Sequence, residues 1–169
     1  YLKIPNKELM LEFEKALEDE SFGYVSKIIE NSKSMLKATV NKDVKIIEEI
    51  LHDIHNSEIP ILQYNDENSL SCVLTLAYLS ARDNYRVERE EKTGKGYADF
   101  TFHPRRKNDT AFIVELKKDE KPEIALKQIR SKEYVEKFKR ENMGKKILAV
   151  AICYDSKEKE HHCLIEEID

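Results

Sequence analysis

Hydrophobic and polar residues alternate along two short segments in the second half of the chain, the pattern of half-buried β-strands. Every second residue is apolar between residues 97 and 102 (Ala98, Phe100, Phe102) and again between residues 112 and 117 (Phe112, Val114, Leu116). The polar residues 104–109 between them have the composition of a turn. The two segments are therefore predicted to pair as an antiparallel hairpin.

Further patterns flank this hairpin. An apolar stripe predicts a helix from Asn65 or Asp66, as its cap, to about Arg82, and residues 85–91 read as a strand. A helix starting at Pro122 is expected to reach about Arg140, with Ile124, Ala125, Ile129, Val135 and Phe138 facing inward. The continuous apolar run 147–153 predicts a central strand, and residues 163–165 a shorter one. The order helix, three strands, helix, two strands is an α/β sandwich.

The first sixty residues predict helices only. Three apolar stripes occur there, with breaks expected at residues 21–23 and 39–41 and an end at Pro60 (Leu9, Met10, Phe13, Ala16, Leu17; Phe22, Val25, Ile28, Ile29, Met35, Leu36; Val44, Ile47, Ile50, Leu51, Ile54). No carboxylate or cysteine pattern joins His52 and His55, so both are predicted to lie at the surface. We expect residues 1–60 to form a helical packing or connecting segment, followed by a domain over residues 61–169.

The predicted hairpin brings two acids together. If the turn is centred on Lys107, Asp99 lies opposite Glu115, with Cβ atoms ~4.5 to 5.5 Å apart. Two carboxylates this close repel each other unless a cation lies between them, and hard oxygen ligands suit Mg²⁺ or Mn²⁺. Lys117 is two residues beyond Glu115 and on the same face. A bound divalent ion with a neighbouring lysine is suited to metal-assisted hydrolysis of a phosphodiester, in which Lys117 orients the water or offsets developing charge.

Asp99 followed by Glu115-Leu116-Lys117 resembles the D…(D/E)xK signature of the PD-(D/E)xK nuclease superfamily, with Ala98 in the place of the proline. Together with residues 90–98, 125–129 and 132–134, it resembles the PD-(D/E)xK domain at the C-terminus of bacterial proteins that carry an AAA-ATPase-like domain. The resemblance covers roughly residues 60–169. It implies a restriction-endonuclease-like core and a possible fused upstream ATPase of the AAA type.

The resemblance also implies two auxiliary residues. In that superfamily a helix before the first strand usually supplies another acid, and Glu67 occupies that place as a third metal ligand. The alternative is that Glu67 complements the helix dipole. The helix after the Glu-x-Lys strand often carries a glutamine, here Gln128, which would hold the metal-bound water or a base. The alternative is that Gln128 satisfies backbone groups.

Composition and charge limit how the protein can contact nucleic acid or a membrane. The net charge of −4 argues against non-specific affinity for DNA spread over the whole surface. Local contact remains open through the basic turn and Lys132, the alternative being that these are solvated charges (Arg105, Arg106, Lys107, Lys132). The three cysteines show no zinc or CxxC spacing, and no apolar run approaches twenty residues, so we expect buried thiols, a cytoplasmic location and no membrane contact. The chain begins at Tyr1, which leads us to expect further sequence upstream.

Three functions compete on these grounds. The leading hypothesis is a Mg²⁺-dependent (or Mn²⁺-dependent) nuclease that cleaves DNA rather than RNA. The second is a catalytically silent domain of the same fold that serves an ATPase as a binding or regulatory module. The third is a helical interaction protein, which the strand pattern disfavours.

Overall fold

The computed structural model describes residues 20–58, 67–89, 99–131 and 133–168. Its helices are α2 (Glu20–Asn41), α3 (Val44–Glu58), α4 (Glu67–Ala77), α5 (Pro122–Ser131) and α6 (Glu133–Glu141), with a 3₁₀ helix η2 (Leu79–Asp83) after α4. Its strands are β1 (Tyr85–Arg89), β2 (Phe100–Pro104), β3 (Ala111–Lys118), β4 (Ile147–Asp155) and β5 (Glu160–Ile168).

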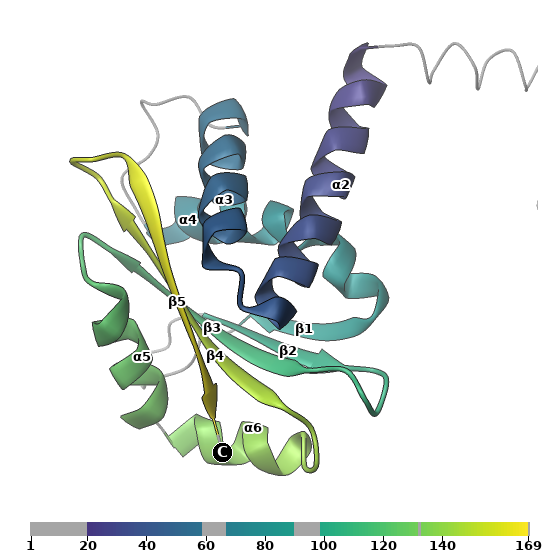
Figure 1. Cartoon of the computed structure of the whole chain (residues 1–169), viewed down its shortest axis with the longest axis vertical. Coiled ribbons are helices and arrows are strands. Elements are labelled where there is room, and N and C mark those ends of the chain that lie inside the picture. Colours follow the sequence, from purple (N-terminus) through teal and green to yellow (C-terminus); the bar gives the residue numbers. More distant parts are fainter. Residues whose placement is uncertain (1–19, 59–66, 90–98, 132, 169) are drawn as a thin grey trace, which may run out of the picture.

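These strands form a five-stranded sheet in the order β1-β2-β3-β4-β5. Strands β3 and β4 are parallel, joined through α5 and α6, and every other neighbouring pair is antiparallel. Figure 1 shows α2, α3 and α4 on one face of the sheet and α5 and α6 on the other. The chain is therefore a mixed α/β structure of three layers, as the sequence predicts.

The register of the hairpin is the predicted one. Phe100 pairs with Val114 and Phe102 with Phe112, so the turn is centred on residue 107. Successive side chains of β3 alternate between two cores, since Phe112 packs on the α2–α4 side and Ile113 on the α5–α6 side. A shift of one residue would exchange the two faces, so this register decides where the polar side chains of β3 point.

The region predicted as one helix over residues 122–140 is two helices, α5 and α6. The prediction that Ile124 faces inward is wrong, because 50% of it is exposed, whereas Leu126 is buried beside Ala125 and Ile129. The helix is thus rotated about its axis relative to the predicted stripe. The apolar pattern alone could not fix this rotation, because Ile124 and Leu126 are both apolar.

The break expected at residues 21–23 is also wrong, because α2 runs through them. Gly23 is exposed inside this helix, where glycine costs only about 1 kcal/mol relative to alanine and does not end a helix. The second break is confirmed: α2 ends at Asn41 and Lys42 has a φ of 60°. The prediction of buried thiols holds for Cys153 and Cys163 but fails for Cys72, which is exposed on α4.

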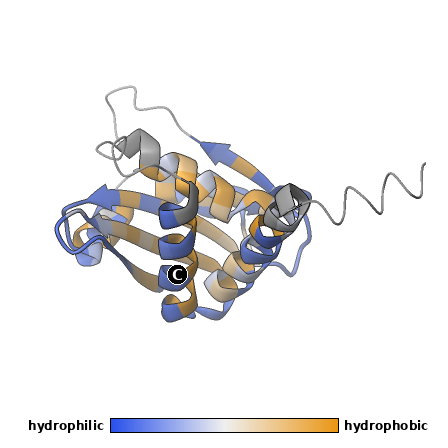
Figure 2. Cartoon of the chain, turned by 90° about the horizontal axis from the view of Figure 1, so that it is seen from above, coloured by the Kyte–Doolittle hydropathy of each residue, from blue (hydrophilic) through white to orange (hydrophobic). Residues whose placement is uncertain are grey.

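The helices before residue 60 share one core with the sheet. Met35 of α2 and Ile47 and Leu51 of α3 are buried in the same cluster as Leu74 and Phe112. Figure 2 shows apolar residues lining the interior between these layers. The stripe expected at residues 9–17 and the boundary expected after residue 60 both lie outside the described residues.

Strand β5 forms one edge of the sheet, and α3 lies against it. The carboxylate of Glu48 accepts a hydrogen bond of 2.8 Å from the backbone N–H of Cys163. The ammonium of Lys42 makes an ion pair of 3.2 Å with Glu167 near the other end of β5. In the part of the chain described here, no helix has the length and apolar character needed to cross a membrane.

Candidate active site

Asp99 lies immediately before β2, where the hairpin register places it beside Glu115. Its carboxylate oxygen Oδ2 accepts a hydrogen bond of 2.7 Å from the backbone N–H of Leu116. The backbone of β3 therefore fixes the position of the Asp99 side chain. The first predicted site residue is held directly against the strand that carries the second.

Glu115 is almost fully buried, with 2% of its surface exposed. It is on β3 between Val114 and Leu116, which belong to the core under α2–α4, so its side chain points to the α5–α6 face. There the amide Nε2 of Gln128 on α5 donates a hydrogen bond to Glu115 Oε1. The ammonium of Lys117 lies 3.2 Å from the same oxygen.

A buried carboxylate with two donors is electrostatically supported. Removing an ionised carboxylate from water is costly unless charged or polar partners replace the solvent. Lys117, whose side chain is 14% exposed, and Gln128 supply this replacement at Glu115. Carboxylate oxygens such as those of Asp99 and Glu115 are the donors that Mg²⁺ and Mn²⁺ prefer, so the residues present fit such an ion.

The end of β3 that carries Lys117 is tied to β4. The backbone N–H of Asp119 donates to the carbonyl of Tyr154 (2.9 Å), and the Asp119 carboxylate accepts from the N–H and the hydroxyl of Ser156 (2.8 and 2.7 Å). These hydrogen bonds lower the pKa of Asp119. Asp119 also has a φ of 55°, which turns the chain out of the strand. The strand end beneath Lys117 is therefore firmly placed.

Glu67 is the first residue of α4, and Leu70, one turn later, lines the same pocket as Leu116. The start of α4 thus lies at the Leu116 end of β3. However, α4 packs on the sheet face opposite Glu115, since Leu70 and Leu74 belong to the α2–α4 core. The side chain of Glu67 lies outside the described residues, so its predicted role as a ligand stays a prediction.

The predicted basic contacts are not near the acids. Arg105, Arg106 and Lys107 are exposed in the β2–β3 turn, whereas Asp99 and Glu115 lie at the open end of the same hairpin. At ~3.3 Å per residue, the separation along β3 is about 20 Å. Lys132 lies outside the described residues. The structure therefore brings together Asp99, Glu115, Lys117 and Gln128 and leaves the basic turn at the opposite end.

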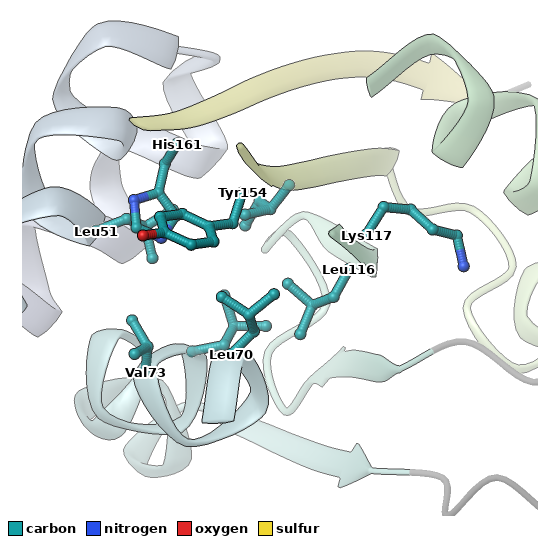
Figure 3. Close-up of a pocket in the computed structure, with 9 residues that line it drawn as sticks. Leu51, Leu70, Val73, Leu116, Lys117, Tyr154 and His161 are labelled. Atoms are coloured by element: carbon teal, nitrogen blue, oxygen red, sulfur yellow. The ribbon is translucent and has the colours of Figure 1, made fainter. Parts of the chain in front are cut away.

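A small pocket lies behind β3 on the other face of the sheet (Figure 3). Six apolar side chains surround it, together with Lys117, Tyr154 and His161 (Leu51, Leu70, Val73, Leu74, Leu116, Ile152). Figure 3 shows the Lys117 side chain extending away from this pocket. The pocket is thus separate from the carboxylate site and belongs to the apolar core.

The sequence did not predict that two histidines near this pocket are buried and in contact. His55, predicted at the surface, is buried, and its Nδ1 lies 3.2 Å from Nε2 of His161, with the ring of Tyr154 against both. Burial lowers the pKa of His161 to about 3, and that of His55 is lowered for the same reason. One signal was available: His55 directly follows Ile54 and lies four residues after Leu51, both on the apolar stripe of α3.

Within the described ranges, one group of three metal-ligating side chains is within 4.8 Å of one another: Glu158, Glu160 and His162, at the β4–β5 turn. Both glutamates are exposed. His162 pairs with Cys153 on β4, and Cys153 pairs with Lys117 on β3, so this group lies two strands away from Lys117. It is not part of the Asp99–Glu115 site.

Comparison with known proteins agrees with this geometry. A family model described as PD-(D/E)XK nuclease superfamily matches residues 65–162, more than half of the chain, and this range includes the predicted site residues from Glu67 to Gln128. Comparison with curated proteins and with solved structures finds no match. The fold is the restriction-endonuclease-like arrangement that the sequence predicts. The chain belongs to the PD-(D/E)XK nuclease superfamily.

Proposed function

We propose that this protein is a metal-dependent nuclease that hydrolyses phosphodiester bonds of nucleic acid at the Asp99–Glu115–Lys117 site. The observation that carries the proposal is the contact between Lys117 and Glu115 on the strand beside Asp99. A domain kept only for packing gains nothing from a buried carboxylate that needs two partners to offset its desolvation. The family also supports nuclease activity.

Each residue has a distinct task. Asp99 and Glu115, with Glu67 as a third candidate ligand, would hold Mg²⁺ or Mn²⁺. Such an ion, when bound, polarises a phosphoryl oxygen and lowers the pKa of water. Lys117 carries a fixed positive charge that offsets charge developing on the phosphate and orients the attacking water. Gln128 holds the Glu115 carboxylate in place through its amide.

Several finer assignments rest on the sequence alone. We propose DNA rather than RNA as the substrate, Mg²⁺ as the usual ion, and an AAA-type ATPase as a fused or separate partner. Arg105, Arg106, Lys107 and Lys132 are proposed phosphate contacts. Because the turn is about 20 Å from the acids, its residues would bind phosphates about six nucleotides away along a duplex strand, at 3.4 Å each.

The proposal is tested with the full chain and the variants Lys117→Ala and Lys118→Ala. Lys118 is the matched control, because it is the next residue of β3 and pairs with Asp119 rather than Glu115 (3.7 Å). We expect Mg²⁺-dependent cleavage of linear, circular or single-stranded DNA by the wild type, abolished by EDTA. Lys117→Ala should lower cleavage by at least about 100-fold, whereas Lys118→Ala should retain it.

Two outcomes would contradict the proposal. Equal cleavage by Lys117→Ala and the wild type would remove Lys117 from the chemistry. Absence of both cleavage and calorimetric Mn²⁺ binding would favour the alternative of a silent binding or regulatory module. Binding of Mn²⁺ without cleavage would point to a requirement for the proposed ATPase partner, to be tested by repeating the assay with an AAA-type ATPase present.

A further inference from the structure

The loop between α6 and β4 packs against the basic turn between β2 and β3. The ammonium of Lys145 in this loop donates a hydrogen bond of 2.8 Å to the carbonyl of Pro104, directly before the turn. The side-chain amide of Asn142, which is 1% exposed, lies 3.1 Å from Nδ1 of His103 on β2 and donates to the carbonyl of Phe138 (2.9 Å). The loop and the turn, which are distant in sequence, therefore form one continuous surface.

Most of the charges on this surface are positive. Residues 104–110 and 139–146 together hold seven cations and two acids (Arg105, Arg106, Lys107, Lys139, Arg140, Lys145, Lys146; Asp109, Glu141). The segments that flank them at the same end of the sheet are nearly neutral, since residues 42–45, 82–84 and 166–168 add three cations and four acids. The whole chain has a net charge of −4. Positive charge is therefore concentrated at this end, and the rest of the chain is acidic.

Four of these cations are exposed and, among the residues that the structure describes, make no ion pair (Arg105, Arg106, Lys107, Arg140). Glu141, which follows Arg140 in the chain, is instead paired with Arg86 (3.4 Å) and Lys137 (3.9 Å). A cation that is not already paired can neutralise a phosphate without losing another contact. The planar guanidinium of arginine also matches two phosphate oxygens at once. The surface thus offers several charges suited to phosphate.

We propose that the α6–β4 loop joins the β2–β3 turn in one surface that binds the sugar–phosphate backbone of nucleic acid, with Arg140 as a principal contact. This inference rests on the proposed nuclease function, which favours nucleic acid over an acidic protein. A protein of net negative charge that binds nucleic acid needs its cations on one side. Lys146 precedes Ala151, the partner of Glu115, by five residues. At ~3.3 Å per residue, the surface is about 17 Å from the acids and contacts the backbone away from the scissile phosphate.

The experiment measures binding of the full chain to a labelled DNA duplex of about 20 base pairs and to one of its strands, in EDTA, between about 50 and 200 mM salt. Arg140→Gln should weaken binding about three- to tenfold and lower the slope of log K against log salt concentration by about one. Arg106→Gln should do the same, and the double variant should lower the slope by about two. Lys33→Gln is the matched control, because it removes the same charge from an exposed position of α2, across the sheet.

Equal effects of Arg140→Gln and Lys33→Gln would overturn the inference, because net charge rather than this surface would then govern affinity. It is also overturned if the wild type binds neither DNA, and binding of a polyglutamate peptide in its place would assign the surface to an acidic protein. Cleavage with Mg²⁺ is measured separately. The expected pattern of binding without cleavage would contradict the nuclease proposal and still support this surface.

Discussion

Asp99 and Leu116 are joined across the open end of the hairpin, where the backbone N–H of Leu116 donates a hydrogen bond of 2.7 Å to the Asp99 carboxylate. The β2–β3 ladder is paired as far as Phe100 and Val114, and the Asp99 carboxylate continues the connection with its side chain. A residue proposed to bind a metal thus also closes the strand pair. Its two tasks can be separated by substitution.

Asp99→Asn keeps an oxygen that accepts the Leu116 N–H but removes the negative charge. It should lose divalent-metal binding and cleavage, while its free energy of unfolding should stay within about 1 kcal/mol of that of the wild type. Asp99→Ala should lose binding as well, and should be less stable than Asp99→Asn by about 1 to 3 kcal/mol, because the Leu116 N–H loses its partner. Calorimetric Mn²⁺ titration and urea unfolding measure both. Equal stability of the two variants would contradict the anchoring role.

Gln128 is expected to act through Glu115. In Gln128→Leu the volume of the side chain is nearly kept but the amide donor is lost, so the Glu115 carboxylate should become less well placed. We expect cleavage to fall about tenfold or more. Lys127→Ala, at the neighbouring exposed position of α5, should leave cleavage within about twofold. A rescue by raised Mn²⁺ concentration in Gln128→Leu would place the defect in metal binding rather than in the fold.

Stability should depend on pH through the buried histidines. The pKa of His161 is lowered to about 3 in the folded protein, from about 6.5 when unfolded. Below pH 6.5 the unfolded chain binds a proton that the folded chain does not. Stability due to neutral His161 is therefore complete above pH 6.5 and is lost as the pH falls toward 3, by about 1.4 kcal/mol per pH unit.

Urea unfolding between pH 4 and 7 checks this expectation. His161→Phe should flatten the dependence of the unfolding free energy on pH, because the ring is kept and the titrating group is lost. Tyr154→Phe is the control, since it keeps the ring that packs against His161 and removes no group that titrates in this range. An unchanged slope in His161→Phe would show that other groups govern acid unfolding.

Leu51 of α3 tests whether the N-terminal helices belong to the core of the site. It is almost fully buried and lines the pocket behind β3. Leu51→Ala should cost about 2 to 5 kcal/mol and lower the midpoint of a single cooperative transition, measured by circular dichroism over the whole chain. A second, unaffected transition would mean that the sheet folds without α3.

The sequence predicts part of this site well, for a physical reason. Strand alternation and the centre of a turn are local properties, so the placement of Asp99 beside Glu115 follows from counting residues. The rotation of α5 about its axis depends on packing against β3 and β4. The sequence pattern therefore predicts Ile124 to face inward, whereas the structure has it exposed.

Burial of His55 depends on a strand more than a hundred residues away, which helix periodicity cannot show. The same limit applies to the basic turn: its composition suggested contact with nucleic acid, but its distance from the acids follows from the length of the strands. The local pattern therefore predicts the β2–β3 register, whereas long-range packing determines which side chains are exposed and how far the basic turn lies from the acids.

The hydrogen bond from the N–H of Cys163 to Glu48 bears on which fragment of this protein is suitable for study in solution. An edge strand with unpaired N–H groups is a template to which another chain can add. Glu48 accepts a hydrogen bond from one such N–H group of β5, and its helix α3 precedes the family match, which begins at residue 65. A fragment cut at that boundary would open the β5 edge. It would also bare part of the apolar face on which Phe112 and Val114 are buried, so we expect such a fragment to self-associate. A fragment prepared for solution work should therefore include α2 and α3.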